Sequence, residues 1–205
     1  MVWNNGRTMD VEHYFTKTPT SKVRYEEFRL VLRKAEFKFV SGSGVFSIGH
    51  IDKGSSLLIE KCLIEDGWRV LDLGCGYGCV GIAVKRLFPE CFVVCSDVNE
   101  RAIDMTKKNA LKNDVKVKAV QSDGYENIKG EFDTILLNPP QTAGKKICKM
   151  LIDGAVGHLK SGGCLQIVAR HQKGGKALSK FMEEAFGNVA DVAKKGGFRV
   201  YISYK

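Results

Sequence analysis

The sequence of 205 residues contains no continuous apolar stretch of about 18 residues, the minimum length for a helix that crosses a membrane. Residues 1–10 are polar and lack the apolar centre of a secretory signal peptide. Internal repeats and low-complexity tracts are also missing. These absences argue against a membrane-spanning or secreted protein and predict a cytoplasmic one.

Paired Cys-x-x-Cys motifs, the usual mark of a structural zinc site, are missing as well. The cysteine count is seven, an odd number, and most of these residues lie within apolar runs. We therefore predict no metal site, and we expect reduced thiols that pack in the core. The seven residues are Cys62, Cys75, Cys79, Cys91, Cys95, Cys148 and Cys164.

Acidic residues are in the minority, because 32 Lys plus Arg face 23 Asp plus Glu and give a formal net charge of +9. Basic side chains displace counterions from phosphates, so this excess favours a polyanionic partner such as RNA. Charge alone equally allows an ordinary basic globular protein. The content of 44% hydrophobic and 27% charged residues is typical of a folded domain.

From residue 67 onward, buried-type strands alternate with stretches of helical spacing. This alternation predicts an α/β fold with a mostly parallel sheet and helices between its strands. Gly196-Gly197 predicts a tight reversal, so that the chain would end in an antiparallel hairpin. The expected strands are 69–73, 91–96, 116–121, 133–137, 164–169, 188–193 and 198–204, and the expected helices are 79–88, 99–112, 143–159 and 175–186.

The preceding residues are expected to form an extension of the same domain. We therefore treat residues 1–205 as one domain, with an extension at 1–66 and a core at 67–205. The elements expected in the extension are a helix over 24–33 with Phe28, Val31 and Leu32 at helical spacing, a β-hairpin of strands 37–40 and 45–48, and a helix over about 54–62 with Asp52 as N-cap.

The strongest local signal is a glycine-rich loop that follows the first core strand. Glycines let the backbone approach a ligand closely at the end of a strand, where open α/β sheets bind ligands. Such a loop alone also fits a dinucleotide, but Asp72 at the strand end suits the cationic amino-acid end of S-adenosylmethionine and would repel a phosphate. The Gly-Lys-Ser/Thr of a P-loop is absent. The residues predicted to hold the cofactor here are Asp72, Gly74, Cys75, Gly76 and Gly78.

Two further aspartates follow the next two strands. Asp97 can accept hydrogen bonds from both ribose hydroxyls, and Val98 beside it offers an apolar surface for adenine. Asp123, followed by Gly124, can accept from the adenine amine. A single such aspartate is equally explained as a helix N-cap. Three aspartates at three successive strand ends favour a cofactor site.

The fourth core strand runs into Asn138-Pro139-Pro140. An exocyclic amine is a poor nucleophile because its lone pair is delocalised into the ring. Two acceptors aimed at its two hydrogens would favour a tetrahedral nitrogen, and the Asn138 side-chain carbonyl and the Pro139 backbone carbonyl can supply them. Proline also fixes the loop conformation. We predict these three residues to be catalytic, with Asn138 also next to the cofactor.

These motifs resemble class I methyltransferases that modify planar amines and amides. Gly44-Val45-Phe46-Ser47 and the segment Asp52-x-Gly54-Ser55-x-Leu57-Leu58 resemble the region before the core in the methyltransferase small domain family. That family includes bacterial small-subunit ribosomal RNA guanine-N2 methyltransferases and short archaeal members. The resemblance implies a Rossmann-like seven-stranded sheet whose last strand is antiparallel, an acceptor pocket at Asn138-Pro139-Pro140, and a hairpin carrying Phe46 that covers the cofactor and the acceptor.

The resemblance makes methyl transfer to guanine N2 in ribosomal RNA, or in an assembled ribosomal particle, the leading hypothesis. Methylation of transfer RNA guanine, methylation of a protein glutamine amide, and a non-catalytic RNA-binding protein remain alternatives. Many relatives carry an aromatic residue after the prolines that can stack on a flipped base, but this chain has Gln141. Phe46 or Tyr125 would then have to stack on the base.

Substrate contacts are expected from Phe46 and Gln141 and from basic residues that follow the catalytic loop and the fifth core strand, chiefly Lys145 and Arg170. Side chains of this kind contact phosphates, but each one alone is equally explained as solvated surface charge. The wider set is Lys146, His171, Lys173, Lys194, Lys195 and Arg199.

Overall fold

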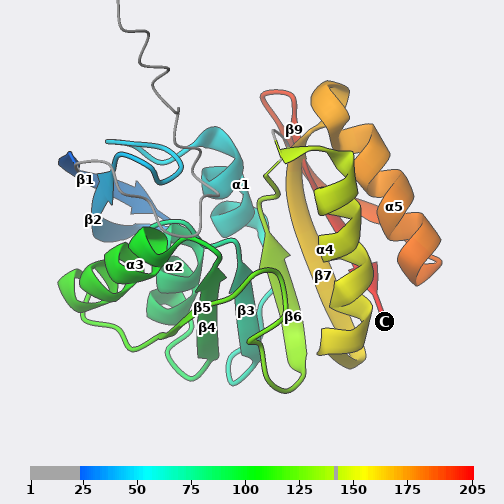
Figure 1. Cartoon of the computed structure of the whole chain (residues 1–205), viewed down its shortest axis with the longest axis horizontal. Coiled ribbons are helices and arrows are strands. Elements are labelled where there is room, and N and C mark those ends of the chain that lie inside the picture. The colour runs from blue at the N-terminus through cyan, green and yellow to red at the C-terminus, as the bar shows by residue number, and fades with distance from the viewer. Residues whose placement is uncertain (1–23, 141–142) are drawn as a thin grey trace, which may run out of the picture.

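The computed structural model describes residues 24–140 and 143–205. Its centre is a seven-stranded sheet in the order β5-β4-β3-β6-β7-β9-β8, and β1 and β2 form a separate hairpin (Figure 1). The strands are β1 (Tyr25–Leu32), β2 (Ala35–Gly42), β3 (Arg69–Leu73), β4 (Phe92–Asp97), β5 (Lys118–Gln121), β6 (Phe132–Leu137), β7 (Leu159–Arg170), β8 (Ala190–Lys195) and β9 (Phe198–Tyr204). The helices are α1 (Lys53–Lys61), α2 (Cys79–Leu87), α3 (Glu100–Lys112), α4 (Lys145–His158) and α5 (Lys176–Phe186).

The sheet is parallel from β5 through β7, and β9 runs antiparallel to both β7 and β8. This arrangement confirms the predicted α/β class with an antiparallel C-terminal hairpin. The hairpin turns at Gly196 and Gly197, whose φ angles are +57° and +80°. Glycine enters this region without a steric penalty, which is why the pair predicted the reversal.

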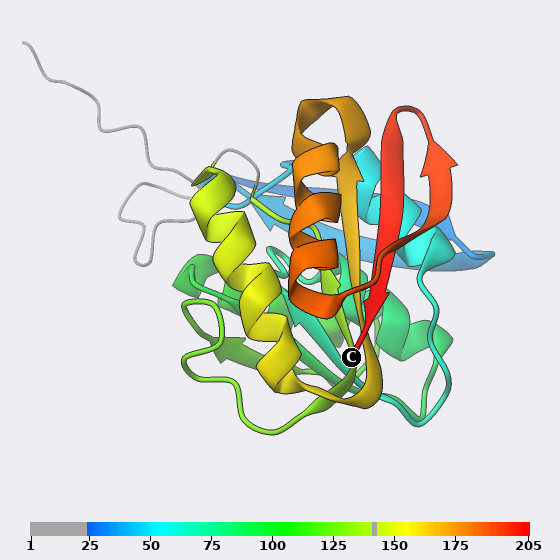
Figure 2. The same ribbon diagram turned by 90° about the vertical axis from the view of Figure 1, so that its right-hand side faces the viewer.

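Helices cover both faces of the sheet. α1, α2 and α3 pack on one face, and α4 and α5 pack on the other, which faces the viewer in Figure 2. Successive residues of a strand point to opposite faces of the sheet, and each face has its own hydrophobic core. Val70 packs with α1, α2 and α3, and Leu71 packs with α4 and α5. Strands buried on both faces give continuous apolar runs in the sequence. All seven cysteines are buried as free thiols, in line with the predicted packing role.

The N-terminal part of the extension differs from the prediction. Residues 24–33 do not form a helix, because Tyr25–Leu32 is strand β1, paired antiparallel with β2. Its buried or half-buried residues are Phe28, Leu30 and Leu32, a spacing of two. The apolar residues fit a helical spacing as well, and pairing with β2 decides between the two patterns.

The hairpin turn was also predicted in the wrong place. β1 and β2 are joined at Arg33 and Lys34, which both have positive φ, +45° and +65°. This is the conformation of a tight two-residue hairpin turn. The predicted second strand, residues 45–48, is instead a loop of turns and bends. The helix expected next is confirmed as α1, and the Asp52 carboxylate caps it by accepting from the backbone N–H of Gly54 and Ser55.

Two asparagines at the C-terminal end of α3, Asn109 and the C-cap Asn113, fasten the hairpin to the core. Asn109 pairs with the backbone N–H and carbonyl of Val40 at 2.7 and 2.8 Å, and Asn113 does the same for Lys38 at 3.0 and 2.7 Å. The two side-chain amides therefore form hydrogen bonds with the backbone of β2, as a neighbouring strand would. Phe37 and Phe39 on the same strand are buried to 0% and 1% exposure. Both polar and apolar contacts fix the hairpin over α3.

Within the described residues, no helix is long and apolar enough to cross a membrane.

Candidate active site

The glycine-rich loop lies between the carboxyl end of β3 and the start of α2. Gly74, Gly76 and Gly78 all have positive φ, at +69°, +57° and +86°. A Cβ on Gly74 would meet no atom within 4 Å, so a side chain there would extend into open space at the edge of the sheet. A Cβ on Gly78 would lie 2.8 Å from Thr106 of α3. The loop thus needs glycine both for its conformation and for its close packing.

Asp72 is buried at the end of β3, at 3% exposure. Its Oδ2 atom accepts a hydrogen bond of 2.8 Å from the backbone N–H of Gly81 in α2. Burial raises the pKa of this carboxyl to about 7, because a charge there is poorly solvated, although the Gly81 hydrogen bond opposes the shift. A cationic group beside Asp72 would favour its ionised form.

Asp97 ends β4 and reaches back to the glycine loop. Its Oδ2 atom accepts from the Gly76 N–H and its Oδ1 atom from the Asn99 N–H, both at 2.9 Å. Burial raises its pKa, while these backbone hydrogen bonds act in the opposite direction. Asn99, which accepts from the Arg101 N–H, is the N-cap of α3, so Asp97 is not needed for that purpose. Each carboxylate oxygen keeps a lone pair for a further donor.

Two adjoining cavities lie at the carboxyl ends of these strands, on either side of Gly74 and Pro140. The first is bounded by the glycine loop, the loop after β6 and the start of α1, and the second by the ends of β4 and β5 and by one face of α4. The first is lined by Phe46, Asp52, Ser55, Asp72, Gly74, Cys75, Gly76, Tyr77, Cys79, Val80, Asn138, Pro139 and Pro140. The second is lined by Leu73, Gly74, Asp97, Val98, Ser122, Asp123, Gly124, Pro140, Ala143, Ile147, Met150 and Leu151.

The side chain of Asn138 is held by the first turn of α1. Its Nδ2 atom donates to Ser55 Oγ at 3.0 Å and lies 3.3 Å from both carboxylate oxygens of Asp52. An ionised carboxylate only accepts hydrogen bonds, so the nitrogen of the amide must face Asp52. The Asn138 carbonyl oxygen therefore points away from Asp52, within the first cavity.

Two prolines follow Asn138 in the loop after β6. The carbonyl of Pro140 accepts from the Ala143 N–H at 2.8 Å. Within residues 24–140 and 143–205, no hydrogen bond reaches the carbonyl of Pro139. Asn138 and Pro139 can therefore each present a carbonyl oxygen to an amine.

The loop that carries Phe46 is tied to the cofactor side of the site. Asn99 Nδ2 donates to the Gly44 carbonyl at 2.7 Å, and an Arg101 guanidinium nitrogen donates to the Ser43 carbonyl at 2.8 Å. Phe46 itself lines the first cavity and is 42% exposed. This loop forms one wall of the first cavity, but it is not part of the hairpin that was expected to carry Phe46.

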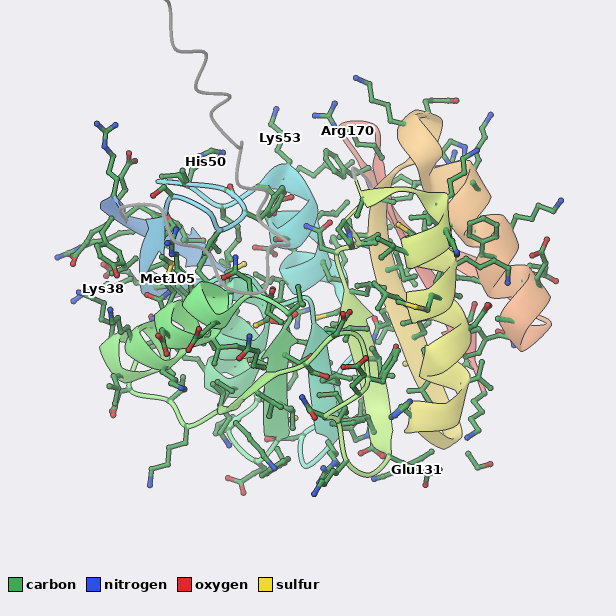
Figure 3. The ribbon with its side chains drawn as sticks, in the orientation of Figure 1. Lys38, His50, Lys53, Met105, Glu131 and Arg170 are labelled. Carbon is green, nitrogen blue, oxygen red and sulfur yellow. The ribbon has the colours of Figure 1, made fainter. Side chains whose placement is uncertain are left out.

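Most of the predicted site residues lie together at the two cavities, but some do not. Lys145 is exposed at the start of α4 and lines neither cavity. The Arg170 guanidinium lies over the Phe198 ring at 5.0 Å, also outside both cavities. Figure 3 shows Arg170 along the same edge as His50 and Lys53, opposite Glu131. Gln141 lies outside the described residues.

Tyr125 is not available to stack on a base. Its ring is stacked on His158 with a centroid distance of 4.3 Å, and its hydroxyl donates to the Leu151 carbonyl at 2.9 Å. Burial raises the pKa of its hydroxyl. Of the two side chains expected to stack on a base, Phe46 therefore lines the first cavity and Tyr125 does not.

Sequence reasoning missed several residues that line the cavities. Asp52 was expected only as an N-cap, and Ser55 only as part of a motif, yet both hold Asn138. Ile147 and Met150 line the second cavity from α4 and are 38% and 53% exposed. Two exposed apolar side chains three residues apart on one helix face indicate a ligand surface. Their exposure is known only from the structure.

Known proteins resemble this chain in sequence and in structure. The model of the methyltransferase small domain matches residues 36–202. This chain belongs to that family. It is 38% identical to the uncharacterized protein YbxB of Bacillus subtilis, over 92% of this chain and 96% of that protein. It is 34% identical to ribosomal RNA small subunit methyltransferase C of Pseudomonas entomophila, over 86% of this chain and 53% of that enzyme.

Solved structures show the same relationship. The T. thermophilus 16S rRNA N2 G1207 methyltransferase RsmC, in complex with AdoMet and guanosine, has a TM-score of 0.77 and 26% identity, over 91% of this chain and 52% of that one. A methyltransferase from Pyrococcus furiosus, at 24% identity and a TM-score of 0.65, shares the fold. The chain thus spans about half the length of the ribosomal RNA methyltransferases it matches.

Proposed function

We propose that this protein transfers a methyl group from S-adenosylmethionine to the exocyclic N2 amine of a guanine in small-subunit ribosomal RNA. The observation that carries the proposal is the fixed orientation of Asn138, whose amide nitrogen is held by Asp52 and Ser55. Its carbonyl and that of Pro139 are the two acceptors that a planar amine requires. The activity would operate in the cytoplasm, where ribosomal RNA is found.

The residues at the two cavities fit S-adenosylmethionine, which supplies a methyl group on a cationic sulfur. Asp72 offers a buried carboxylate for the cationic amino-acid end, beside glycines that leave space for it. In the second cavity, Asp97 would accept from the ribose hydroxyls and Asp123 from the adenine amine. Val98 and Met150 would contact the adenine ring. Within the described residues, no group of three acidic, histidine or cysteine side chains is placed to hold a metal.

The residues of this chain would position the amine and orient its nitrogen lone pair. Two hydrogen bonds, to the carbonyl oxygens of Asn138 and Pro139, would draw the amine hydrogens to one side and turn its lone pair toward the methyl group. Phe46 would stack on the flipped guanine. The proton of the methylated amine would leave after transfer, to solvent, so that no general base is needed. His171, whose Nδ1 atom lies 2.7 Å from the Tyr201 hydroxyl, takes no part.

RNA is a better substrate than a protein amide on two grounds. The formal charge of +9 favours a polyanion, and several relatives, such as that of Pseudomonas entomophila, are named ribosomal RNA small subunit methyltransferase C. RsmC also binds guanosine, the nucleoside proposed for this site. Lys145 and Arg170 would contact phosphates around the mouth of the site, since both lie at carboxyl-end segments and are exposed.

The test is to incubate the protein with isotopically labelled S-adenosylmethionine and with unmodified ribosomal RNA, transfer RNA and ribosomal subunits. Digestion and mass spectrometry would then identify the labelled nucleoside. We expect N2-methylguanosine from small-subunit RNA. Label in another nucleoside, or only in transfer RNA, would overturn the substrate. Label in a protein glutamine alone would overturn the RNA assignment.

A further inference from the structure

A groove lies directly beside the first cavity, on the other side of the first turn of α1; the first cavity is called the acceptor cavity below, after its proposed role. It is bounded by the end of β1, one face of α1 and the β8–β9 turn, and its volume is about 670 Å³. Ligand sites of about 300–1,000 Å³ accommodate molecules as large as a nucleotide. The lining residues are Val31, Leu32, Ile51, Lys53, Ser56, Leu57, Glu60, Lys61, Lys195, Gly196 and Phe198.

Consecutive residues of the chain face the two cavities alternately. Ile51 and Lys53 line the groove, whereas Asp52 between them lines the acceptor cavity. Ser55 lines the acceptor cavity and the next residue, Ser56, lines the groove. Only the first turn of α1 therefore separates the groove from Asn138, so a chain that delivers one unit to the acceptor cavity would pass over the groove with its neighbouring units.

Positive charge surrounds this groove. Lys53, Lys61 and Lys195 are exposed, and none forms a salt bridge with a carboxylate of the described residues. The single acidic residue, Glu60, already accepts a hydrogen bond of 3.0 Å from the Arg33 backbone N–H. Lysines that come from two separate elements around one groove are suited to successive phosphates of a single strand.

The interior of the groove is apolar and suits sugars and bases. Ile51, Leu57 and Phe198 contribute to it, and Val31 is 67% exposed at its rim. The Phe198 ring packs over Gly54, where an added Cβ would lie 3.1 Å from it, and the Arg170 guanidinium covers it at 5.0 Å. Single strands bind to proteins through this combination of basic rim and apolar or aromatic surface.

We propose that this groove binds the RNA strand next to the target nucleotide, with Lys53, Lys61 and Lys195 on its phosphates. The proposal rests on the proposed RNA methyltransferase function and adds a second, separate contact area to it. The flipped guanine would enter the acceptor cavity, and the flanking nucleotides would run across α1 toward the β8–β9 turn. An acidic segment of a protein partner is the competing occupant.

The test compares two triple variants of equal charge change. The groove variant is Lys53→Glu, Lys61→Glu, Lys195→Glu. Its control is Lys116→Glu, Lys118→Glu, Lys129→Glu, three exposed lysines near the amino ends of β5 and β6. The probe is a fluorescein-labelled RNA stem-loop with guanines in its loop, and its Kd is measured by anisotropy with S-adenosylhomocysteine present.

We expect the groove variant to raise the Kd for this RNA at least about tenfold and to reduce the slope of log Kd against log salt by about 2, since each single-strand phosphate contact contributes about 0.7. The control should stay within about twofold of the wild type. Equal weakening by both variants, or no weakening by the groove variant, would overturn the proposal. In the second case, the protein partner becomes the occupant to seek.

Two further measurements distinguish a failure of this proposal from a failure of the proposed methyltransferase function. A milder variant, with glutamine at the same three positions, should weaken RNA binding in the same direction while S-adenosylmethionine binding and Tm stay unchanged. Free guanosine has neither phosphates nor neighbours, so its methylation should be equal in the wild type and the groove variant. Absence of methyl transfer from the wild type would reject the proposed function, while the RNA titration would still decide the role of the groove.

Discussion

Asp52 lies 86 residues before Asn138 in the chain, yet its two carboxylate oxygens are both 3.3 Å from the Asn138 amide nitrogen. The same carboxylate caps α1 by accepting from the N–H of Gly54 at 2.8 Å and of Ser55 at 3.1 Å. The cap of one helix thus fixes the rotamer of the residue proposed to orient the amine. Asp52 is a positioning residue, because it acts through Asn138.

Replacing Asp52 with Asn should separate these two tasks. Asparagine is as good an N-cap as aspartate, so α1 and Tm should be almost unaffected. Its own amide nitrogen would face that of Asn138, and loss of a hydrogen bond to a charged group costs about 1.5–3 kcal/mol. We expect kcat to fall about 10- to 100-fold with an unchanged Kd for S-adenosylmethionine.

Ser55→Ala removes the second acceptor and should lower kcat by a smaller factor, about three- to tenfold, as expected for a neutral hydrogen bond. Ser56→Ala is the matched control, since Ser56 faces the groove and not Asn138. Equal kcat for Asp52→Asn and the wild type would show that Asn138 does not depend on this contact.

Asn138 and Asp97 should differ in the step they affect. Asn138→Ala removes a carbonyl needed only when the amine reacts, so turnover should fall at least about 100-fold while cofactor affinity changes less than about threefold. Asp97→Ala should weaken cofactor binding first. Calorimetry and steady-state kinetics on both variants check this contrast, and a collapse of cofactor binding in Asn138→Ala would mean that its role is wrong.

Asp72 should make cofactor binding depend on pH. Its pKa in the free protein is about 7, and a bound cation would lower it, so binding requires loss of a proton below pH 7. Affinity should therefore fall by up to about tenfold from pH 7.5 to pH 6. Asp72→Asn should bind more weakly and show a flat profile over this range. Calorimetry in buffers of different ionisation enthalpy would detect the released proton.

The ionised Asp72 carboxylate, which favours cofactor binding, lowers the stability of the folded protein. Because its folded-state pKa lies above the ordinary value of 3.8, the ionised carboxyl destabilises the fold, and this cost develops as pH rises from about 4 to 7. Asp72→Asn should raise Tm relative to the wild type more at pH 8 than at pH 5. An equal difference at both pH values would contradict the burial of the charge.

Phe46 should govern the acceptor rather than the cofactor. Base stacking on an aromatic ring contributes about 1–3 kcal/mol, so Phe46→Ala should raise the KM for guanosine about 5- to 100-fold. Phe46→Tyr keeps a ring of similar shape and should stay near the wild-type value. Loss of S-adenosylmethionine binding in Phe46→Ala would indicate instead that the residue shapes the cofactor cavity.

The parallel core and its glycine loop could be predicted because their signals are local. Strands such as β3 are short apolar runs that end in a carboxylate and glycines, and every one of these features lies within ten residues of sequence. The N-terminal hairpin could not be predicted in the same way. Phe28, Val31 and Leu32 fit a helix, and only pairing with β2 makes Tyr25–Leu32 a strand.

The site residues also differ in whether a local signal in the sequence could predict them. The aspartates at strand ends were predictable because parallel topology brings strand ends together. The contact of Asp52 with Asn138 depends on how the start of α1 lies beside the loop that follows β6, which no spacing in the sequence encodes. Tyr125 was misjudged for a related reason: its position near a strand end is compatible with the site, but packing against His158 turns its ring away.

Asn109 has a consequence for the order in which the chain folds. Its amide nitrogen donates both to Val40 of the hairpin and to the Tyr77 carbonyl of the glycine loop, each at 2.8 Å. The polar docking partners of the hairpin are synthesised about 70 residues after it. During translation the hairpin therefore cannot dock through these hydrogen bonds until α3 has been synthesised.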